Sequence, residues 1–458
     1  MRFAGRAACA GAVALLLLFA ASGLQTAAAQ SADPAAPRLE LPPVGLRVQD
    51  LALIVNDADP NSVELGRYYA QQRKIDAANV VHVSFPPGQA SLSALDFERV
   101  QATLRAKVPA AVQAYALAWT LPYRVDCMSI TSAFAFGFDP TYCAQGCRPT
   151  RPSPYFDSDS SAPASDFGLR PAMLLAGKDL AAAKALIDRG VRSDNRWPEG
   201  TAYLLSTSDR KRNVRAASHD EVRRRLGAAV RIRRVDGDAL EGQTDVLFYF
   251  TGVQRVSDLG RHRFVDGAMA DHLTSLGGVL ADSSQTTALE WLDAGATGSY
   301  GNTIEPCNFL EKFPDIGVAM GRFLGGETLI EAYWKSVRMP GQGVFVGEPL
   351  ARPFGGLRSL REGRDLIVRT RLLRPGRYAL LASAGQIGPF RRVAEWAVPT
   401  YGTQEIRLSA VAGSYFRVVG LAGGSRYPRP PERVETFYAA VPLARPLTVR
   451  SRSTRCPS

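Results

Sequence analysis

Residues 245–253 read DVLFYFTGV, and this stretch decides the class of fold. An unbroken run of large apolar residues that ends in Thr-Gly predicts a strand buried on both faces, as in parallel sheets covered by helices. Other apolar runs of strand length occupy residues 51–56, 80–85, 114–122 and 200–207. Segments with helical spacing alternate with them, at residues 62–73, 94–108, 178–194, 218–229, 286–295 and 325–337. This alternation predicts an α/β fold with a mostly parallel sheet flanked by helices.

The last part of the chain has a different pattern. From Asp365 onward the helical periodicity stops, and short apolar runs alternate with Gly, Pro and polar turns. We expect a small all-β sandwich over residues 365–458, after a Gly- and Arg-rich linker at 355–364. The α/β part then divides into a first subdomain, residues 48–195, and a second, residues 196–354.

The chain starts with a segment typical of a secretory signal. Arg2 and Arg6 precede an apolar run, and an Ala-x-Ala site predicts cleavage after Ala29, so residues 1–29 form the signal. A Pro-rich lead follows at residues 30–47. We therefore expect an exported protein, periplasmic or extracellular. We expect no membrane span, because no later apolar stretch reaches the roughly 20 residues that a span needs.

The charge balance is basic but diffuse. The chain has 55 Lys and Arg against 43 Asp and Glu, a net charge of +12. The arginines are spread along the chain, and no nucleic-acid-binding motif accompanies them. We expect a solvated basic face and no nucleic-acid partner.

Cysteine use fits an oxidising compartment. Cys127, Cys143 and Cys147 lie close together in a turn-rich segment. We expect a disulfide among these three, with a zinc site as the alternative, although no histidine lies nearby to complete four ligands. The number of cysteines after the signal is odd, so at least one thiol of a monomer stays free, with Cys307 and Cys456 as candidates.

The order of several motifs resembles that of gingipain-type cysteine peptidases, a branch of the caspase–haemoglobinase fold. An Asp-rich loop, a strand and a long helix at residues 154–194 resemble the end of their first subdomain. Residues 245–253 resemble their strand that ends in Gly-His-Gly, and residues 326–337 and 344–353 resemble their Gly-Glu-Ala helix and closing Gly-Asp-Pro segment. The resemblance spans roughly residues 48–445 and implies a caspase-like sheet followed by an immunoglobulin-like sandwich. As a whole, the chain also resembles an uncharacterised family of exported bacterial proteins.

The catalytic dyad of those peptidases does not carry over to this chain. In the family, a histidine at the strand end assists a thiolate after the next strand, because a thiol near its ordinary pKa of about 8.5 is mostly unreactive without help. Here the histidine position reads Thr251-Gly252-Val253, and the stretch that would hold the cysteine, residues 267–278 (GAMADHLTSLGG), contains none. We expect a shared fold without the peptidase mechanism.

Two substitutes for the dyad are open at this edge of the sheet. In the first, His272 assists Cys307 as nucleophile, since both follow strands that end at the same expected edge. In the second, Ser275 is the nucleophile, with His272, Asp271 or groups from elsewhere as partners.

A third hypothesis needs no covalent chemistry, because parallel sheets bind ligands beyond the carboxyl ends of their strands. The residues that would line such a cleft are Thr251, Gly252, Asp271, Thr274, Gly277, Gly278 and Glu305. The purely structural alternative is that Asp271 or Thr274 caps a helix while Gly277 and Gly278 form a tight turn.

A Cys- and Asp-rich insertion interrupts the first subdomain at residues 122–170. It contains Asp157, Asp159 and Asp166, whose oxygens suit Ca²⁺, although no EF-hand spacing is present. The alternative is that these residues form a solvated loop. Calcium is the only cofactor that the sequence suggests.

The favoured hypothesis is an exported protein with a degenerate peptidase fold that binds a peptide, glycan or envelope partner in the cleft. The alternatives are a cysteine-type hydrolase that uses His272 and Cys307, and an envelope structural or adhesion module. The sequence indicates no oligomeric state.

Overall fold

A computed structural model describes most of the chain. The described residues are 37–144, 147–257, 259–363, 365–409, 414–421, 437–440 and 446–450. The predicted signal and Cys456 lie outside them. Among these residues, no helix has the length and apolar character needed to cross a membrane.

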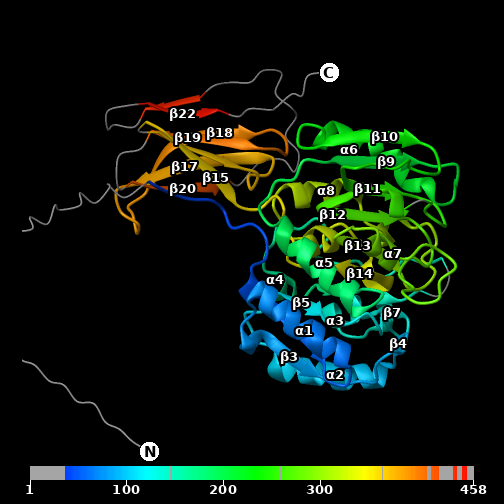
Figure 1. Cartoon of the computed structure of the whole chain (residues 1–458). Coiled ribbons are helices and arrows are strands. Elements are labelled where there is room, and N and C mark those ends of the chain that lie inside the picture. The colour runs from blue at the N-terminus through cyan, green and yellow to red at the C-terminus, as the bar shows by residue number, and fades with distance from the viewer. Residues whose placement is uncertain are drawn as a thin grey trace, which may run out of the picture.

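One large sheet of 10 strands organises the α/β part (Figure 1). From one edge to the other, its strands are β10 (Arg231–Asp236), β9 (Thr201–Ser206), β11 (Val246–Thr251), β12 (Phe264–His272), β13 (Gly298–Asn302), β14 (Gly343–Gly347), β8 (Ala172–Leu174), β5 (Ala114–Leu117), β2 (Leu51–Asn56) and β3 (Val80–Val83). The predicted α/β class with a mostly parallel sheet is confirmed.

The sheet consists of two parallel halves that run in opposite directions. Every neighbouring pair is parallel except β13 and β14, which pair antiparallel from Gly298↔Gly347 to Asn302↔Gly343. The first half contains β3, β2, β5, β8 and β14, and the second contains β10, β9, β11, β12 and β13. Consequently, the strands of the two halves point in opposite directions. Their carboxyl ends lie along one edge of the sheet in the first half and along the opposite edge in the second, where these edges are the two sides at which the strands begin and end.

Helices cover both faces of the sheet, which explains the apolar strands. One face packs against α1 (Pro60–Arg73), α5 (Leu180–Ser193), α6 (His219–Leu226), α8 (Ile316–Leu324) and α9 (Leu329–Trp334). The other packs against α2 (Ala94–Lys107), α3 (Ile130–Phe136) and α7 (Ala288–Asp293). In β11 every residue is buried, as the opening stretch predicts.

The insertion at residues 122–170 is ordered and contains secondary structure of its own. The strands β6 (Arg124–Val125) and β7 (Met128–Ser129) form a small sheet with β4 (Ser91–Leu92). Helix α3, the short 3-10 helix η3 (Pro140–Tyr142) and α4 (Pro163–Phe167) follow. Short elements and a disulfide therefore order this insertion.

The C-terminal part contains two smaller sheets, as the strand pattern predicts. One contains β15 (Leu357–Glu362), β16 (Asp365–Thr370), β19 (Gln404–Ser409), β22 (Pro446–Arg450) and β21 (Phe437–Ala440). The other contains β1 (Arg38–Glu40), β20 (Tyr415–Gly420), β17 (Gly376–Ser383) and β18 (Arg391–Val398). Ile406 and Leu408 of the first share a core with Leu380, Trp396 and Val398 of the second.

Two segments outside the predicted sandwich belong to it. Residues 357–362, predicted as linker, form β15 and pair with β16. Strand β1, which lies in the Pro-rich lead, pairs in parallel with β20. The lead therefore runs from the sandwich to the α/β part, as the blue trace in Figure 1 shows.

Candidate functional site

The predicted cleft lies where β9, β11, β12 and β13 end. Strand β12 ends at His272, so Asp271 and His272 are the last two residues of a strand. The alternative in which Asp271 caps a helix is therefore wrong. Because successive side chains of a strand point to opposite faces, the two residues have separate surroundings.

Asp271 is buried and forms an ion pair with an arginine from a distant segment. Its Oδ1 accepts a hydrogen bond of 2.6 Å from Arg215 of the 3-10 helix η4 (Asn213–Ser218). Arg215 also donates to the carbonyl of Thr251 at 2.9 Å. Burial raises the pKa of Asp271, and Arg215 opposes this shift only in part. Asp271 thus anchors η4 to the end of the sheet and is 1% exposed.

His272 points to the other face and lies against a tryptophan. Its Nδ1 accepts a hydrogen bond of 2.9 Å from the Trp291 indole of α7. Burial, together with the smaller effect of the Arg215 charge, lowers the pKa of His272 to about 3. The imidazole is therefore neutral and faces the core.

Of the two candidates for a free thiol, Cys307 is not free, and Cys456 lies outside the described residues. Cys307 forms a disulfide with Cys147, across 160 positions of the sequence. A disulfide sulfur cannot act as the thiolate nucleophile, so the hypothesis that pairs His272 with Cys307 fails in this structure. The spacing of cysteines gave no sign that Cys147 has its partner in the second half of the sheet.

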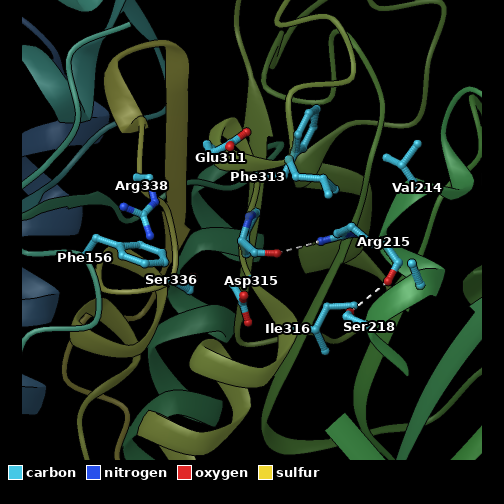
Figure 2. Close-up of a pocket in the computed structure, with 13 residues that line it drawn as sticks. Phe156, Val214, Arg215, Ser218, Glu311, Phe313, Asp315, Ile316, Ser336 and Arg338 are labelled. Carbon is cyan, nitrogen blue, oxygen red and sulfur yellow. Dashed lines mark hydrogen bonds between the residues drawn. The ribbon is translucent and has the colours of Figure 1, made fainter. Parts of the chain in front are cut away.

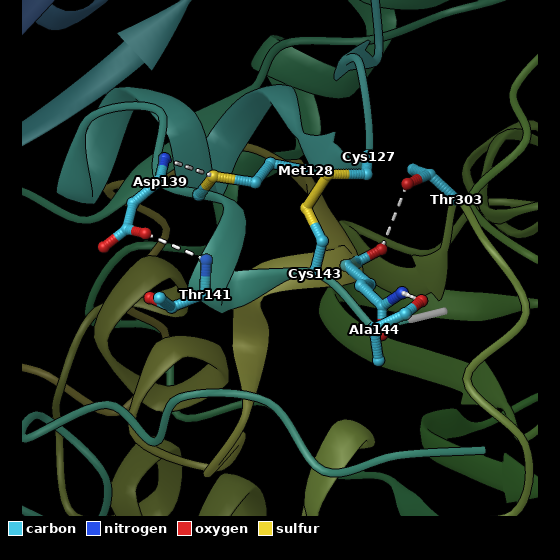
Figure 3. Close-up of a disulfide and its surroundings, with 8 residues drawn as sticks. Cys127, Met128, Asp139, Thr141, Cys143, Ala144 and Thr303 are labelled. Atoms are coloured by element: carbon cyan, nitrogen blue, oxygen red, sulfur yellow. Dashed lines mark hydrogen bonds between the residues drawn. A yellow bond between two sulfur atoms is a disulfide. The ribbon is translucent and has the colours of Figure 1, made fainter. Parts of the chain in front are cut away.

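The predicted disulfide within the insertion is present. Cys127 and Cys143 are bonded, with their Cα atoms 5.6 Å apart (Figure 3). Beside them, the backbone N–H of Asp139 donates to the sulfur of Met128, and Asp139 caps η3 through the N–H of Thr141. Disulfides rather than zinc therefore hold the predicted cysteines.

The glycine pair after β12 provides close backbone packing. A Cβ added to Gly278 would stand 2.3 Å from the carbonyl oxygen of Gly301 on β13. The Gly277 carbonyl accepts from the N–H of Ala288 at the start of α7. Gly277 and Gly278 therefore form the predicted tight turn, and both are buried.

Gly252, at the end of β11, has a similar packing role. A Cβ there would stand 2.0 Å from the carbonyl oxygen of Arg212. The segment that contains η4 thus packs directly on the strand end. The crevice between β9 and β11 has no room for a solvent molecule.

An open hollow remains beside this packed region. It has a volume of about 420 Å³ and is lined by Lys211, Arg212, Leu273, Thr274, Ser275, Glu305, Cys307 and Asn308. The structure therefore brings together Thr274 and Glu305 of the predicted cleft with Ser275, the proposed nucleophile. Thr251, Gly252, Asp271, His272, Gly277 and Gly278 do not line it.

Most polar groups of this hollow have protein partners. The Thr274 hydroxyl donates to Gln285 at 2.8 Å and accepts from Arg212 at 3.1 Å. Arg212 also pairs with Asp209 at 2.8 Å, and Glu305 accepts from the backbone N–H of Cys307. Ser275 makes no hydrogen bond to His272 within the described part of the chain, so no nucleophile–base pair forms.

A second hollow of about 440 Å³ lies next to η4 on the α8 side (Figure 2). Arg215 and Ser218 border it on one side and Phe156 with Arg338 on the other, the guanidinium lying 4.3 Å from the ring centre. Arg215 also approaches the carbonyl of Pro314 at 3.5 Å. Arg215 therefore lines this second hollow but not the first.

The three aspartates proposed for calcium bind other partners. Asp157 and Asp159 each pair with Arg322 of α8 at 2.7 Å, and Asp166 accepts from Ser160 at 2.5 Å. Across the described ranges, no group of three or more His, Cys, Asp or Glu side chains could hold a metal ion. The structure thus gives the calcium hypothesis no support.

Asp159 instead helps to connect the two parts of the molecule. It also pairs with Arg374, which precedes β17 of the sandwich, at 2.7 Å. Arg374 and Arg322 both contact the buried Glu327, and Lys335 pairs with the same carboxylate at 3.1 Å. A charged network of this kind at a domain junction is costly to break, because each lost partner leaves a buried charge.

Sequence reasoning missed the residues that form hydrogen bonds with the predicted site residues. Arg215, Trp291 and Arg212 come from segments far from GAMADHLTSLGG, and no motif marks them. Arg215 lies in the Arg-rich stretch 210–215, which resembles a solvated surface in sequence, yet Arg215 is 6% exposed.

Comparison with known proteins adds no assignment. The chain matches no protein-family model and has no significant match among curated sequences.

Proposed function

We propose that this protein is an exported, non-catalytic binding protein that holds an acidic peptide segment in the hollow beside Ser275. One observation carries the proposal. The cysteine that a cysteine-type hydrolase would use at this edge is in a disulfide, while an open hollow with several polar side chains remains beside it.

The charges of the hollow support an acidic ligand. Lys211, Arg212 and the acidic Glu305 line it, and Arg212 already pairs with Asp209, so the case for an acidic ligand depends on Lys211. No ion pair to Lys211 occurs among the residues that the structure covers, so its ammonium group is available to a carboxylate. Because Lys211 is exposed, solvent screens an ion pair of this kind, which contributes at most about 1 kcal/mol.

The resemblance to gingipain-type peptidases supports a peptide as the ligand. In those proteins this edge of the sheet holds the nucleophile and therefore meets a peptide chain. In this chain the immunoglobulin-like identity of the sandwich and the caspase-like identity of the sheet are part of the same proposal. The two disulfides support export, because disulfides persist in oxidising compartments.

Fluorescence anisotropy with a labelled acidic hexapeptide tests the proposal. The comparison peptide has the same sequence with Asp and Glu replaced by Asn and Gln. We expect saturable binding of the acidic peptide only, weakened up to about fivefold by Lys211→Gln, which corresponds to about 1 kcal/mol. Lys107→Gln, at the exposed end of α2, is the matched control and should bind as the unchanged protein does.

A cleavage assay separates binding from hydrolysis. The protein is incubated with a peptide library, and the products are read by mass spectrometry. We expect intact peptides. Cleavage that disappears in Ser275→Ala would show that the protein is a serine hydrolase and would overturn the proposal, as would equal binding of the acidic and neutral hexapeptides.

A further inference from the structure

A second crevice is present at the opposite edge of the sheet. In the first half, the chain leaves β2 through α1 on one face to reach β3, and returns through α2 on the other face to reach β5. The chain then leaves β5 towards α3 on the same face as α2, so the segments that follow β2 and β5 diverge. In open α/β sheets, ligands bind at such a topological switch point, beyond the carboxyl ends of the strands.

The structure has an open hollow at this point. Its volume is about 580 Å³, within the usual range for small-molecule sites. Residues that follow β2, β5 and β8 line it, including Asp59, Thr120 and Asp179. Because β13 and β14 are antiparallel, it lies at the other edge of the sheet from the hollow beside Ser275.

The floor of this hollow is apolar and held in place. Leu65, Trp119 and Leu289 form part of it. The Trp119 indole donates to the carbonyl of Pro122 at 3.2 Å, and its ring meets the edge of Phe85 at 5.2 Å between centroids. A preformed apolar surface of this kind suits an aliphatic or aromatic group.

The rim of the hollow is acidic. Asp59 caps α1 and Asp179 caps α5, each through one oxygen that accepts a backbone N–H. Neither carboxylate has an ion-pair partner in the described ranges. Lys178, the one cation of the lining, is paired with Asp293 at 3.2 Å. This local excess of negative charge stands out in a chain with a net charge of +12.

We propose that this crevice binds a primary amine carried on an apolar group, such as a free amine or the N-terminus of a peptide with an apolar first residue. The ammonium pairs with Asp59 and Asp179, and the apolar group packs on Trp119 and its neighbours. An anion is disfavoured, although helix N-termini attract anions, because the capping carboxylates already occupy both helix ends.

Isothermal titration calorimetry with matched probes tests this inference. Leucinamide carries the amine and the apolar group, N-acetyl-leucinamide lacks the charge, and 4-methylpentanoate replaces it with a carboxylate. We expect saturable binding of leucinamide alone among these three. A tripeptide, Leu-Ala-Ala, then shows whether peptide N-termini enter as well as free amines.

The capping residues allow a clean variant. In the double variant Asp59→Asn/Asp179→Asn both helix caps remain, because Asn caps helices about as well as Asp. We expect leucinamide affinity to fall at least tenfold with an unchanged melting temperature. Asp76→Asn is the matched control, because Asp76 caps the 3-10 helix that precedes β3 and does not line the hollow.

Three outcomes would overturn the inference: no saturable binding of leucinamide, equal binding of the acetylated probe, or full affinity in the double variant. The test is independent of the proposed function, because Lys211→Gln should leave leucinamide binding unchanged.

Discussion

The two halves of the large sheet have the same order of strands, yet their switch-point crevices differ. In each half the first strand, β2 or β9, has the second strand on one side and the third on the other. In the first half the crevice between β2 and β5 is an open hollow of about 580 Å³. In the second half the crevice between β9 and β11 is filled.

The difference comes from the segment after the first strand. In the first half, residues 57–59 form a short turn and α1 starts at Pro60. In the second half, residues 207–218 separate β9 from α6, and η4 within them folds back over the strand ends. A longer connection can thus fill the crevice with its own residues, and the hydrogen bond from Arg215 to Asp271 holds η4 in that position. Strand order alone therefore does not say whether a switch point is open.

The largest expected effect concerns the link between the halves. The disulfide Cys147–Cys307 closes a loop of 160 positions and joins the insertion of the first half to the loop after β13, whereas Cys127–Cys143 closes one of 16. By the chain-entropy model these loops correspond to about 5 and about 3 kcal/mol. We expect Cys147→Ser/Cys307→Ser to lower the urea midpoint more than Cys127→Ser/Cys143→Ser. Equal midpoints would mean that the long link does not restrain the unfolded chain as expected.

The next effect concerns η4, which fills the crevice between β9 and β11. In Arg215→Met, Asp271 loses its ion-pair partner in a buried site, and loss of one partner from a buried pair costs about 3–5 kcal/mol. The matched control is Arg67→Met in the first half, whose pair with Glu64 is exposed and should therefore cost little stability to remove.

Urea unfolding measures both variants. The double variant Arg215→Met/Asp271→Asn removes both charges and should recover part of the loss. If Arg215→Met were no more destabilised than Arg67→Met, the packing of η4 would not depend on the pair Arg215–Asp271.

The sequence was sufficient for the class of fold and for part of the site. The apolar strand 246–250 and the alternation of patterns predict a helix-covered, mostly parallel sheet, because strands buried on both faces need continuous apolar runs. The sequence did not predict β10, whose residues RIRRVD are mostly exposed at the sheet edge and lack an apolar run. It also missed α8, because a helix buried on all sides has no polar face to reveal its period.

The site was harder to predict because its contacts are long-range. Of the seven residues predicted to line the cleft, Thr274 and Glu305 line one hollow together with Ser275, since the ends of parallel strands meet at one edge. Nothing local indicates that His272 faces Trp291 or that Cys307 pairs with Cys147. These contacts depend on the packing of α7 and of the insertion, which the spacing of residues does not encode.

The smallest effect concerns the loss of stability at acidic pH. We expect it to arise in the second half of the sheet. His272 and His219 are buried there, and burial lowers their pKa values to about 3 and about 4, from an ordinary value of 6.5. A lowered pKa means that the unfolded chain binds the proton first. Stability is then fully present above about pH 6.5 and falls as the pH drops, by about 1.4 kcal/mol per pH unit for each histidine.

We therefore expect unfolding free energies measured between pH 6.5 and pH 5 to decline steeply, by about 2 kcal/mol for each of the two groups. In His272→Gln the amide oxygen can still accept the Trp291 hydrogen bond, but the titration is gone, so the decline should be about half as steep. His219→Gln should reduce the slope by a similar amount, and the double variant should be nearly flat over this range. If the slope were unchanged in both single variants, the buried histidines of the second half would not be the origin of the acid sensitivity.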